Sequence, residues 1–346
     1  MAEENRSANP EQKPEDKKSA KSAEEKSKLL RSVSPTPHVR SARSTSSIMK
    51  WVILALMPAT LHGIRYFGPK ALVILLLSII SCVLSEWCFE KITKQKSTIG
   101  DFSAVVTGLL LGLNLPVAVP LWMPVLGGFF AIVVVKMLFG GLGQNFMNPA
   151  LGARCFLMLS FSKYMTDFSY RPGWGNADVI TGPTPLAMLK NGESFNLMDM
   201  FIGYHGGTIG EVSGSALLIG GCFLLVIGVI TWHVTFPYII SMLLFVAAFS
   251  GHGFDADYLL AHLYGGGLML GAFFMATDYV TRPITKKGQI IYGIFLGVLT
   301  GIFRIFGPGA EGVSYAIIIG NLIVPLIERI TLPKHFGWKK PAAKKS

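Results

Sequence analysis

The sequence predicts an all-α polytopic membrane protein with about ten transmembrane helices. Of its 346 residues 51% are hydrophobic and only 15% are charged, whereas a soluble domain carries roughly 25% charged residues. The apolar residues also gather in runs whose lengths approach the roughly 20 residues that a helix needs to cross a bilayer. Polar loops separate these runs.

Ten apolar segments make up this prediction. They are residues 49–67, 70–91, 101–118, 121–139, 148–162, 214–233, 236–251, 259–278, 288–306 and 312–331. The fifth is short, and the letters LNLP at 113–116 interrupt the third. A broken span is tolerated only where protein or a cavity covers the freed backbone groups, so we expect such cover at the breaks.

The segments fall into two membrane halves, residues 46–162 and 214–331, with five spans each. Because five is odd, two related halves would insert with opposite orientations. The stretch GLLLGLNLP (108–116) resembles GLMLGAFFM (267–275), which favours two inverted five-helix halves with broken helices. Glycine-rich apolar helices also resemble one another in unrelated proteins, and both interpretations stay open.

Both ends of the chain are basic. Residues 1–50 hold Lys or Arg at eleven positions and Asp or Glu at seven, without apolar periodicity, so we expect residues 1–45 to be a disordered cytoplasmic tail. Residues 332–346 form a second basic cytoplasmic tail. The net charge of +11 gathers in tails and loops beside apolar spans, which is typical of a cytoplasmic membrane face. We therefore expect no nucleic acid partner.

Loop charge predicts the orientation in the membrane. The loops at 91–100 and 279–288 are basic, and ten spans place them on the same face as both tails. The loop at 163–213 lies on the other face, with three Lys or Arg against five Asp or Glu. We therefore expect a multi-pass protein of a bacterial inner membrane, with both termini cytoplasmic and residues 163–213 extracytoplasmic, that is, periplasmic.

Residues with metal-binding or catalytic spacing are not evident. The four cysteines and seven histidines show neither C-x-x-C nor H-E-x-x-H spacing, so we expect no metal site and no complete active site in this chain alone. Glu86, Lys136 and Arg154 lie toward the inner ends of their spans, where we expect them to snorkel to the membrane surface. Ions would then pass either along partner chains or along backbone carbonyls at the breaks 113–116 and 140–149.

The stretch DVITGPTPLAMLK (178–190) carries one threonine between helix-breaking residues. Pro185 suits the first position of a helix, so PLAMLKNG predicts a short helix that ends at Gly192 and has Thr184 as its N-cap. Threonine caps helices in proteins of every kind, and this is the plain interpretation of Thr184.

A second interpretation of Thr184 is a phosphate site. A group attached to its hydroxyl would lie beside the backbone N–H groups of Leu186 and Ala187, at the positive end of the helix dipole. Gly182 would allow close backbone approach in front of it. Geometry alone leaves both interpretations open.

The same stretch resembles a known modification motif. Residues Asp178-x-x-Thr181-Gly182-Pro183-Thr184 resemble D-x-x-[ST]-G-A-T, at which a flavin transferase attaches flavin mononucleotide (FMN) to threonine through a phosphoester. The resemblance implies covalent FMN on Thr184, with Asp178, Thr181 and Gly182 read by the transferase and shaping the turn. Pro183 stands where the motif has alanine, and it stiffens the loop.

Three further stretches resemble the same family. They are GGLGQNFMNPALGARCFL (140–157), MATDYVTRPITKKGQIIYG (275–293) and PTPHVRS (35–41). By these motifs the chain resembles the flavin-bearing membrane subunits of Rnf complexes and of Na⁺-pumping quinone reductases, from about residue 35 to 331. Its length and moderate outer loop resemble the D-type member of the Rnf complex, an ion-translocating ferredoxin:NAD oxidoreductase, more than the longer B-type member of the quinone reductase.

The resemblance also implies a second, riboflavin-like flavin. A glycine- and amide-rich break would suit its polar edge, formed by Gly140, Gly141, Gly143, Asn145, Asn148 and Pro149. The alternative is a turn closed by asparagine caps. Thr277 and Asp278 either border that flavin or cap the next segment, and Arg304 either faces the FMN phosphate or snorkels.

The function that this resemblance implies is electron transfer. The chain would be one subunit of an ion-translocating oxidoreductase, and covalent FMN would carry electrons between ferredoxin and NAD with coupled movement of Na⁺ or H⁺. Its partners would be Rnf subunits of the A, B, C, E and G types, with the flavin transferase for maturation. One alternative is the B-type subunit of the quinone reductase, and another is a passive channel for small solutes without a redox cofactor.

Overall fold

The computed structural model describes residues 43–174, 178–193, 196–307 and 312–333. The chain divides into two units, Met1–Ser44 and Thr45–Ser346, and everything below concerns the second. Of the two predicted tails, residues 1–42 and 334–346 lie outside the described residues.

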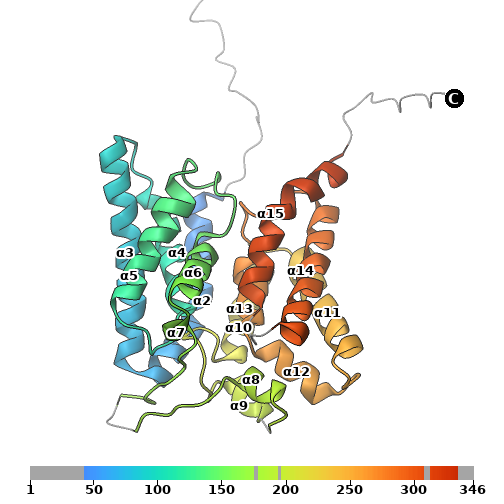
Figure 1. Cartoon of the computed structure of the whole chain (residues 1–346). Coiled ribbons are helices and arrows are strands. Elements are labelled where there is room, and N and C mark those ends of the chain that lie inside the picture. Colours follow the sequence, from blue (N-terminus) through green and yellow to red (C-terminus); the bar gives the residue numbers. More distant parts are fainter. Residues whose placement is uncertain (1–42, 175–177, 194–195, 308–311, 334–346) are drawn as a thin grey trace, which may run out of the picture. The chain divides into compact units, whose positions relative to one another are not determined.

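Helices make up the framework of the second unit, and Figure 1 shows most of them side by side. The first half contains α2 (Thr45–Phe67), α3 (Pro69–Thr93), η1 (Ile99–Asp101), α4 (Ser103–Leu113), α5 (Trp122–Phe129), η2 (Phe130–Met137) and α6 (Pro149–Ser160). The second half contains α10 (Gly214–Ile227), α11 (Trp232–Phe249), α12 (Ala256–Tyr264), α13 (Leu268–Leu270), η3 (Gly271–Met275), α14 (Lys286–Phe306) and α15 (Val313–Thr331). Between the halves lie α7 (Ser162–Met165), α8 (Pro185–Lys190) and α9 (Leu197–Ile202). In the described part of the chain extended backbone pairs only in isolated bridges, so the all-α prediction is confirmed there.

Each of the ten predicted segments contains a helix, but the helices differ in length. Five are long and apolar enough to cross a membrane: α2, α3, α11, α14 and α15. The pair formed by α12 and α13–η3 gives a sixth candidate that is bent by 61°. Four further apolar helices have only 10–17 residues. Within the described residues the chain is therefore a helical membrane protein with five or six spans by length, and the prediction of about ten is not confirmed.

The break after α4 explains why the third predicted segment is short. The helix ends at Leu113, shortly before Pro116, which cannot donate a ladder hydrogen bond. The carbonyls of Leu113 and Leu115 accept hydrogen bonds from the backbone N–H groups of Gly210 (2.8 Å) and Ile209 (3.1 Å). The expectation that protein covers this break is confirmed, because the segment before α10 supplies the missing donors.

At the break between α12 and α13, the side chain of Arg304 supplies hydrogen-bond donors to the free backbone carbonyls. This side chain is 3% exposed, and its guanidinium donates to the carbonyl oxygens of His262, Gly265 (2.8 Å) and Gly266 (3.1 Å). Gly266 and Gly267 both have positive φ, which lets the chain bend sharply there. A buried cation thus replaces the helical donors that the break removes.

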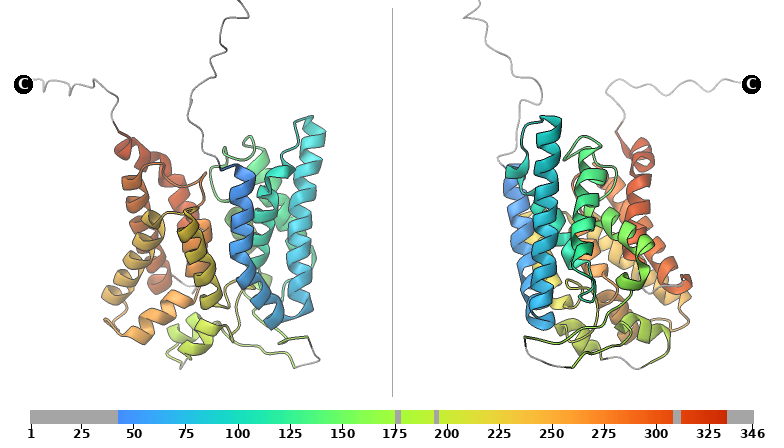
Figure 2. Two further views of the ribbon diagram at one scale, coloured as in Figure 1. Left: turned by 180° about the vertical axis from the view of Figure 1, so that it is seen from behind. Right: turned by 60° about the vertical axis from the view of Figure 1, so that its left-hand side comes forward.

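The two ends of this unit are distinct. The first turn of α2 and the last turn of α15 lie at one end of the helices, and α8 and α9 lie at the opposite end (Figures 1 and 2). The loop that carries Thr184 is therefore separated from the start of α2 by the length of the helices.

Candidate functional site

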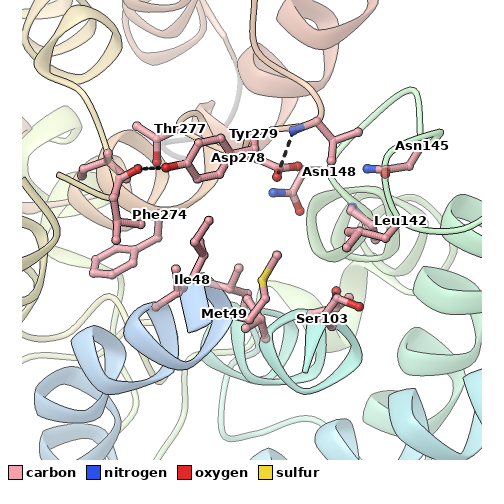
Figure 3. A pocket seen from close by; sticks show the side chains of 18 of the residues that line it. Ile48, Met49, Ser103, Leu142, Asn145, Asn148, Phe274, Thr277, Asp278 and Tyr279 are labelled. Atoms are coloured by element: carbon pink, nitrogen blue, oxygen red, sulfur yellow. Dashed lines mark hydrogen bonds between the residues drawn. The ribbon is translucent and has the colours of Figure 1, made fainter. Parts of the chain in front are cut away.

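A small, mainly apolar cavity with a few polar side chains lies where the two halves meet, near the first turn of α2 (Figure 3). Its volume is about 80 Å³. The first half contributes residues of α2, α4, η2 and the segment 140–149, and the second half contributes residues around η3. Five residues predicted from two distant motifs line it together: Asn145, Asn148, Pro149, Thr277 and Asp278.

The two asparagines serve the fold and the cavity at once. The Asn148 side chain accepts hydrogen bonds from the backbone N–H groups of Ala150 (3.0 Å) and Leu151 (3.4 Å), so it is the N-cap of α6. The Asn145 side chain is 6% exposed and donates to the Met147 carbonyl (3.0 Å), while its Oδ1 is buried without a partner. A buried orphan acceptor is costly, so this oxygen fits a ligand that donates a hydrogen bond.

The three glycines of the same motif have a backbone role. Gly140, Gly141 and Gly143 all have positive φ, between 91° and 114°, which side chains with a Cβ rarely adopt. None of these three glycines lines the cavity in the described part of the chain. They let the chain turn from η2 into α6 and so place the asparagines, but the structure does not bring the glycines themselves to the cavity.

Thr277 and Asp278 enter the cavity from the second half. The Thr277 hydroxyl donates back to the Phe273 carbonyl (2.6 Å), so it does not cap the following segment. The Asp278 carboxylate accepts hydrogen bonds from the Val280 N–H (3.4 Å) and the Thr281 hydroxyl (3.2 Å) and closes the next turn. Both residues also line the cavity. The turn predicted at Asp278 is confirmed, whereas a flavin beside Thr277 and Asp278 stays a prediction.

Sequence reasoning missed two buried charged clusters near this cavity. Lys136 lies 2.7 Å from Glu86 in an ion pair whose side chains are 2% and 0% exposed. Arg154, 5% exposed, donates to Asn114 (2.8 Å) and to Ser314 of α15 (3.0 Å). The snorkelling prediction is therefore wrong for all three charges, because neighbouring helices cover them. A charged residue within an apolar segment is itself a signal of such a cluster. Charges are costly in a membrane and usually face the interior of the protein, where they pair with other polar groups.

At the opposite end, the structure confirms the short helix after Thr184. Helix α8 runs from Pro185 to Lys190 with Thr184 as its N-cap, and Gly192 follows with a φ of 76°. The Thr184 side chain makes no capping hydrogen bond. Its hydroxyl is therefore not committed to the helix, although Thr184 is only 9% exposed.

The residues before Thr184 form the exposed part of this loop. Residues 178–183, including Asp178, Thr181 and Gly182, are all exposed. An antiparallel bridge holds the loop, because Tyr170 and Ile180 exchange backbone hydrogen bonds of 2.8 and 3.0 Å. A Cβ added at Gly182 would meet open space, so the loop leaves room for a group to approach there.

A second cavity, of about 460 Å³, lies beside this loop, and we call it the aromatic cavity because two tyrosines and a histidine help to line it. Thr181, Gly182, Tyr170, Tyr204 and His205 line it. The Tyr170 hydroxyl hydrogen-bonds the Tyr66 hydroxyl of α2 at 2.6 Å, which ties the loop to the membrane helices. Burial lowers the pKa of His205 below its ordinary value, and hydrogen bonds with the backbone of Gly206 and Val212 partly offset this.

The remaining predicted residues make contacts that stabilise the fold, and their roles beside a flavin stay predictions. Leu186 is buried and packs against Gly266. A Cβ added at Gly266 would lie 2.7 Å from the Leu186 side chain. Ala187 is half-buried, and its carbonyl accepts from the Asn191 N–H (3.1 Å) at the end of α8. Arg304 donates to the carbonyls of the α12–α13 break, a role that neither sequence interpretation included. The expectation that it faces a phosphate is not tested by these contacts.

These features define a helical membrane protein with a small, mainly apolar cavity between two sets of helices and an aromatic cavity at the opposite end. The chain belongs to the NQR2, RnfD, RnfE family, whose sequence model matches residues 32–337.

Individual relatives match over nearly their whole lengths. The RnfD-type member of the Na⁺-translocating ferredoxin:NAD⁺ oxidoreductase complex of Acetobacterium woodii is 46% identical, covering 89% of this chain and 96% of its own. Its counterpart in the proton-translocating ferredoxin:NAD⁺ oxidoreductase complex of Clostridium ljungdahlii is 40% identical, covering 90% and 98%. The counterpart in the ion-translocating oxidoreductase complex of Aliivibrio salmonicida is 35% identical, covering 89% and 99%.

Proposed function

We propose that this chain is the D-type subunit of an Rnf-type complex and carries electrons between ferredoxin and NAD through FMN bound covalently to Thr184. The names of the relatives, which are subunits of ferredoxin:NAD⁺ oxidoreductases, support the reaction. Those names include one sodium- and one proton-translocating complex, so coupling to either ion is compatible with the family.

The placement of Thr184 is the observation that carries this proposal. The threonine that completes the flavin-attachment motif begins α8, its hydroxyl makes no capping bond, and an exposed loop and an aromatic cavity adjoin it. Bound FMN would supply one- and two-electron redox chemistry. The Thr184 oxygen would hold the phosphate, and the rings of Tyr170 and Tyr204 offer surfaces on which a planar group stacks.

Attachment requires a movement of the loop. Thr184 is 9% exposed, so its hydroxyl has to emerge before a transferase can reach it. Residues 178–183 are exposed and hold few buried contacts, so displacing them costs little hydrophobic burial. Pro183 restricts the backbone of this segment and keeps Gly182 extended in front of the threonine.

The cavity between the halves is proposed to hold the second, riboflavin-like flavin. Three polar groups in its mainly apolar wall suit the polar edge of a flavin. They are the Asn145 oxygen that has no hydrogen-bond partner, the Asp278 carboxylate and the Lys136 ammonium group. The cavity's 80 Å³ is below the roughly 300 Å³ of ordinary ligand pockets. Binding of a flavin therefore requires this cavity to widen.

The proposed topology has ten crossings, with both termini in the cytoplasm and α8 and α9 outside. It accounts for the position of the start of α2 and the end of α15 at one end of the helices (Figures 1 and 2). The basic loops 91–100 and 279–288 adjoin that same end and agree with the positive-inside rule. Partner Rnf subunits would cover the short helices. The break after α4 lies in the first half and the break between α12 and α13 lies in the second half, which is compatible with an inverted repeat.

Thr184→Ala tests the proposal in cells that express the flavin transferase. The matched control is Thr166→Ala, because Thr166 is an exposed threonine of the same loop outside the motif. We expect the Thr184→Ala chain to lose in-gel flavin fluorescence and the Thr166→Ala chain to keep it. Equal fluorescence in both variants would contradict the attachment site.

The electron acceptor separates this proposal from the B-type alternative. The family includes NQR2, so a quinone-reducing relative shares the fold. The purified complex should reduce NAD⁺ with reduced ferredoxin and should not depend on added quinone. A colourless chain that conducts small solutes in liposomes would favour a channel instead.

A further inference from the structure

An open groove lies between the last turn of α10 and the first turns of α11, with the start of α14 at its rim. Its volume is about 670 Å³. We call it the α10–α11 groove. Its apolar lining residues are Leu225, Ile230, Trp232 and Phe236, and its polar lining residues are Thr231, His233 and Lys286.

Hydrogen bonds place this groove at the end of the helices where α15 finishes. The hydroxyl of Thr285, the N-cap of α14, donates to the hydroxyl of Thr331 in the last turn of α15 (2.9 Å). The Arg282 guanidinium donates to the hydroxyl of Thr231, the residue before α11 (3.3 Å). The groove therefore lies near one end of the membrane helices, at the depth of the lipid headgroups.

The apolar side of the groove is built for contact with lipid. Trp232 and Phe236 are both exposed, and they lie one turn apart on α11. Tryptophan gathers where a bilayer meets water, because its ring is apolar and its N–H is polar. Leu225 continues the apolar wall onto α10. In a bilayer this wall suits an acyl chain.

The rim of the groove is positively charged. Lys286 is exposed and is the first residue of α14. Residues 279–289 contain three Lys or Arg and neither Asp nor Glu. Glu328 of α15 accepts a hydrogen bond from the Ile284 N–H (3.1 Å), and no acidic side chain lines the groove in the described part of the chain. The rim therefore attracts an anion.

His233 supplies an observation that is independent of charge. Its ring stacks on that of Trp232, with centroids 4.2 Å apart. Its Nδ1 is buried and has no hydrogen-bond partner among the residues that the structure describes. Buried polar atoms nearly always have a partner, and an imidazole nitrogen can donate or accept. Because His233 lines the groove, a polar ligand held there would supply this partner.

We propose that the α10–α11 groove binds an anionic phospholipid from the leaflet at this end of the helices. Its phosphate lies beside Lys286, and one acyl chain lies along Leu225 and Phe236. A zwitterionic phospholipid offers the same chain, but its own ammonium group offsets the charge of its phosphate. Free phosphate has the charge and lacks the chain. An anionic phospholipid alone among these matches both sides of the groove.

Native mass spectrometry of the delipidated full-length chain in detergent tests this site. The chain is titrated with dioleoylphosphatidylglycerol, with dioleoylphosphatidylcholine, and with dioleoylphosphatidylglycerol in the presence of sodium phosphate. Lys286→Gln should weaken phosphatidylglycerol binding about fivefold, because a lysine near an anionic membrane surface contributes about 1 kcal/mol. Lys286→Arg should keep the binding.

The matched control is Lys96→Gln, which removes one charge from an exposed lysine in the other basic loop, outside the groove. It should bind phosphatidylglycerol as the unmodified chain does. Equal weakening in Lys96→Gln and Lys286→Gln would reveal diffuse attraction to a basic face and overturn the inference. Equal affinity for phosphatidylcholine, or displacement of the lipid by sodium phosphate, would overturn it too.

A second measurement locates the lipid. Phosphatidylglycerol with brominated acyl chains should quench the tryptophan fluorescence of the unmodified chain more than that of Trp232→Phe, because bromine quenches on contact. Equal quenching would place the lipid elsewhere and reject the groove. The purified complex should retain phosphatidylglycerol that its Lys286→Gln counterpart loses. A complex without this lipid, formed from a chain that binds it alone, would show that a partner helix fills the groove instead.

Discussion

Replacing Arg304 by methionine should destabilise the second half of the protein by about 3 kcal/mol or more. The guanidinium donates to three backbone carbonyls of the α12–α13 break, those of His262, Gly265 and Gly266. Each buried carbonyl left without a donor costs about 1–3 kcal/mol. Three of them set a lower bound of about 3 kcal/mol, and direct measurements on broken buried charge networks give about 3–5 kcal/mol.

The thermal unfolding midpoint of the purified chain in detergent measures this effect. For a chain of this size about 1 kcal/mol shifts the midpoint by roughly 2 °C, so Arg304→Met should melt at least about 6 °C lower. Arg329→Met is the matched control, because Arg329 is exposed near the end of α15 and its loss should change little. If both variants melt at the same temperature, the guanidinium does not hold the break and our interpretation of Arg304 is wrong.

Three more predictions follow from the same contacts. Gly266→Ala should lower the unfolding midpoint more than Gly253→Ala, because both have positive φ but only at Gly266 would a Cβ meet other side chains, at 2.7 Å. Arg154→Met should destabilise by about 2–4 kcal/mol, measured in the same melt, because it leaves two buried acceptors on different halves without their charged donor. Burial lowers the pKa of His205, so the stability from its neutral form is complete above about pH 6.5 and is lost as pH falls toward the lowered value. His205→Asn should flatten this fall in a series of melts from pH 7 to pH 5, and an unchanged slope would contradict the assignment.

Local signals in the sequence predicted the helices and the Thr184 turn well. Pro185 and Gly192 are short-range cues: α8 begins at Pro185 as predicted, and it ends at Lys190, two residues before the predicted end at Gly192. The apolar runs also located a helix in every predicted segment. Their lengths were overestimated where the chain breaks at Asn114 and Gly265, since hydropathy does not register how a break is capped.

The cavity could be predicted only in part. Asn145 and Asp278 were selected from separate motifs, and no sequence pattern states that residues so far apart in the chain meet, yet both line one cavity. The Lys136–Glu86 pair was misjudged because snorkelling depends on which side of a helix faces lipid. That side is set by packing against α3 and α4, which only the structure provides.

The most direct test of the electron-carrier account is peptide mass spectrometry of the purified chain from cells that express the transferase. We expect the peptide that contains Thr184 to carry the added mass of FMN, joined by a phosphoester at that residue. A peptide of unmodified mass, recovered in full yield from a complex that still transfers electrons, would show that Thr184 is not the attachment site and that the electrons take another route.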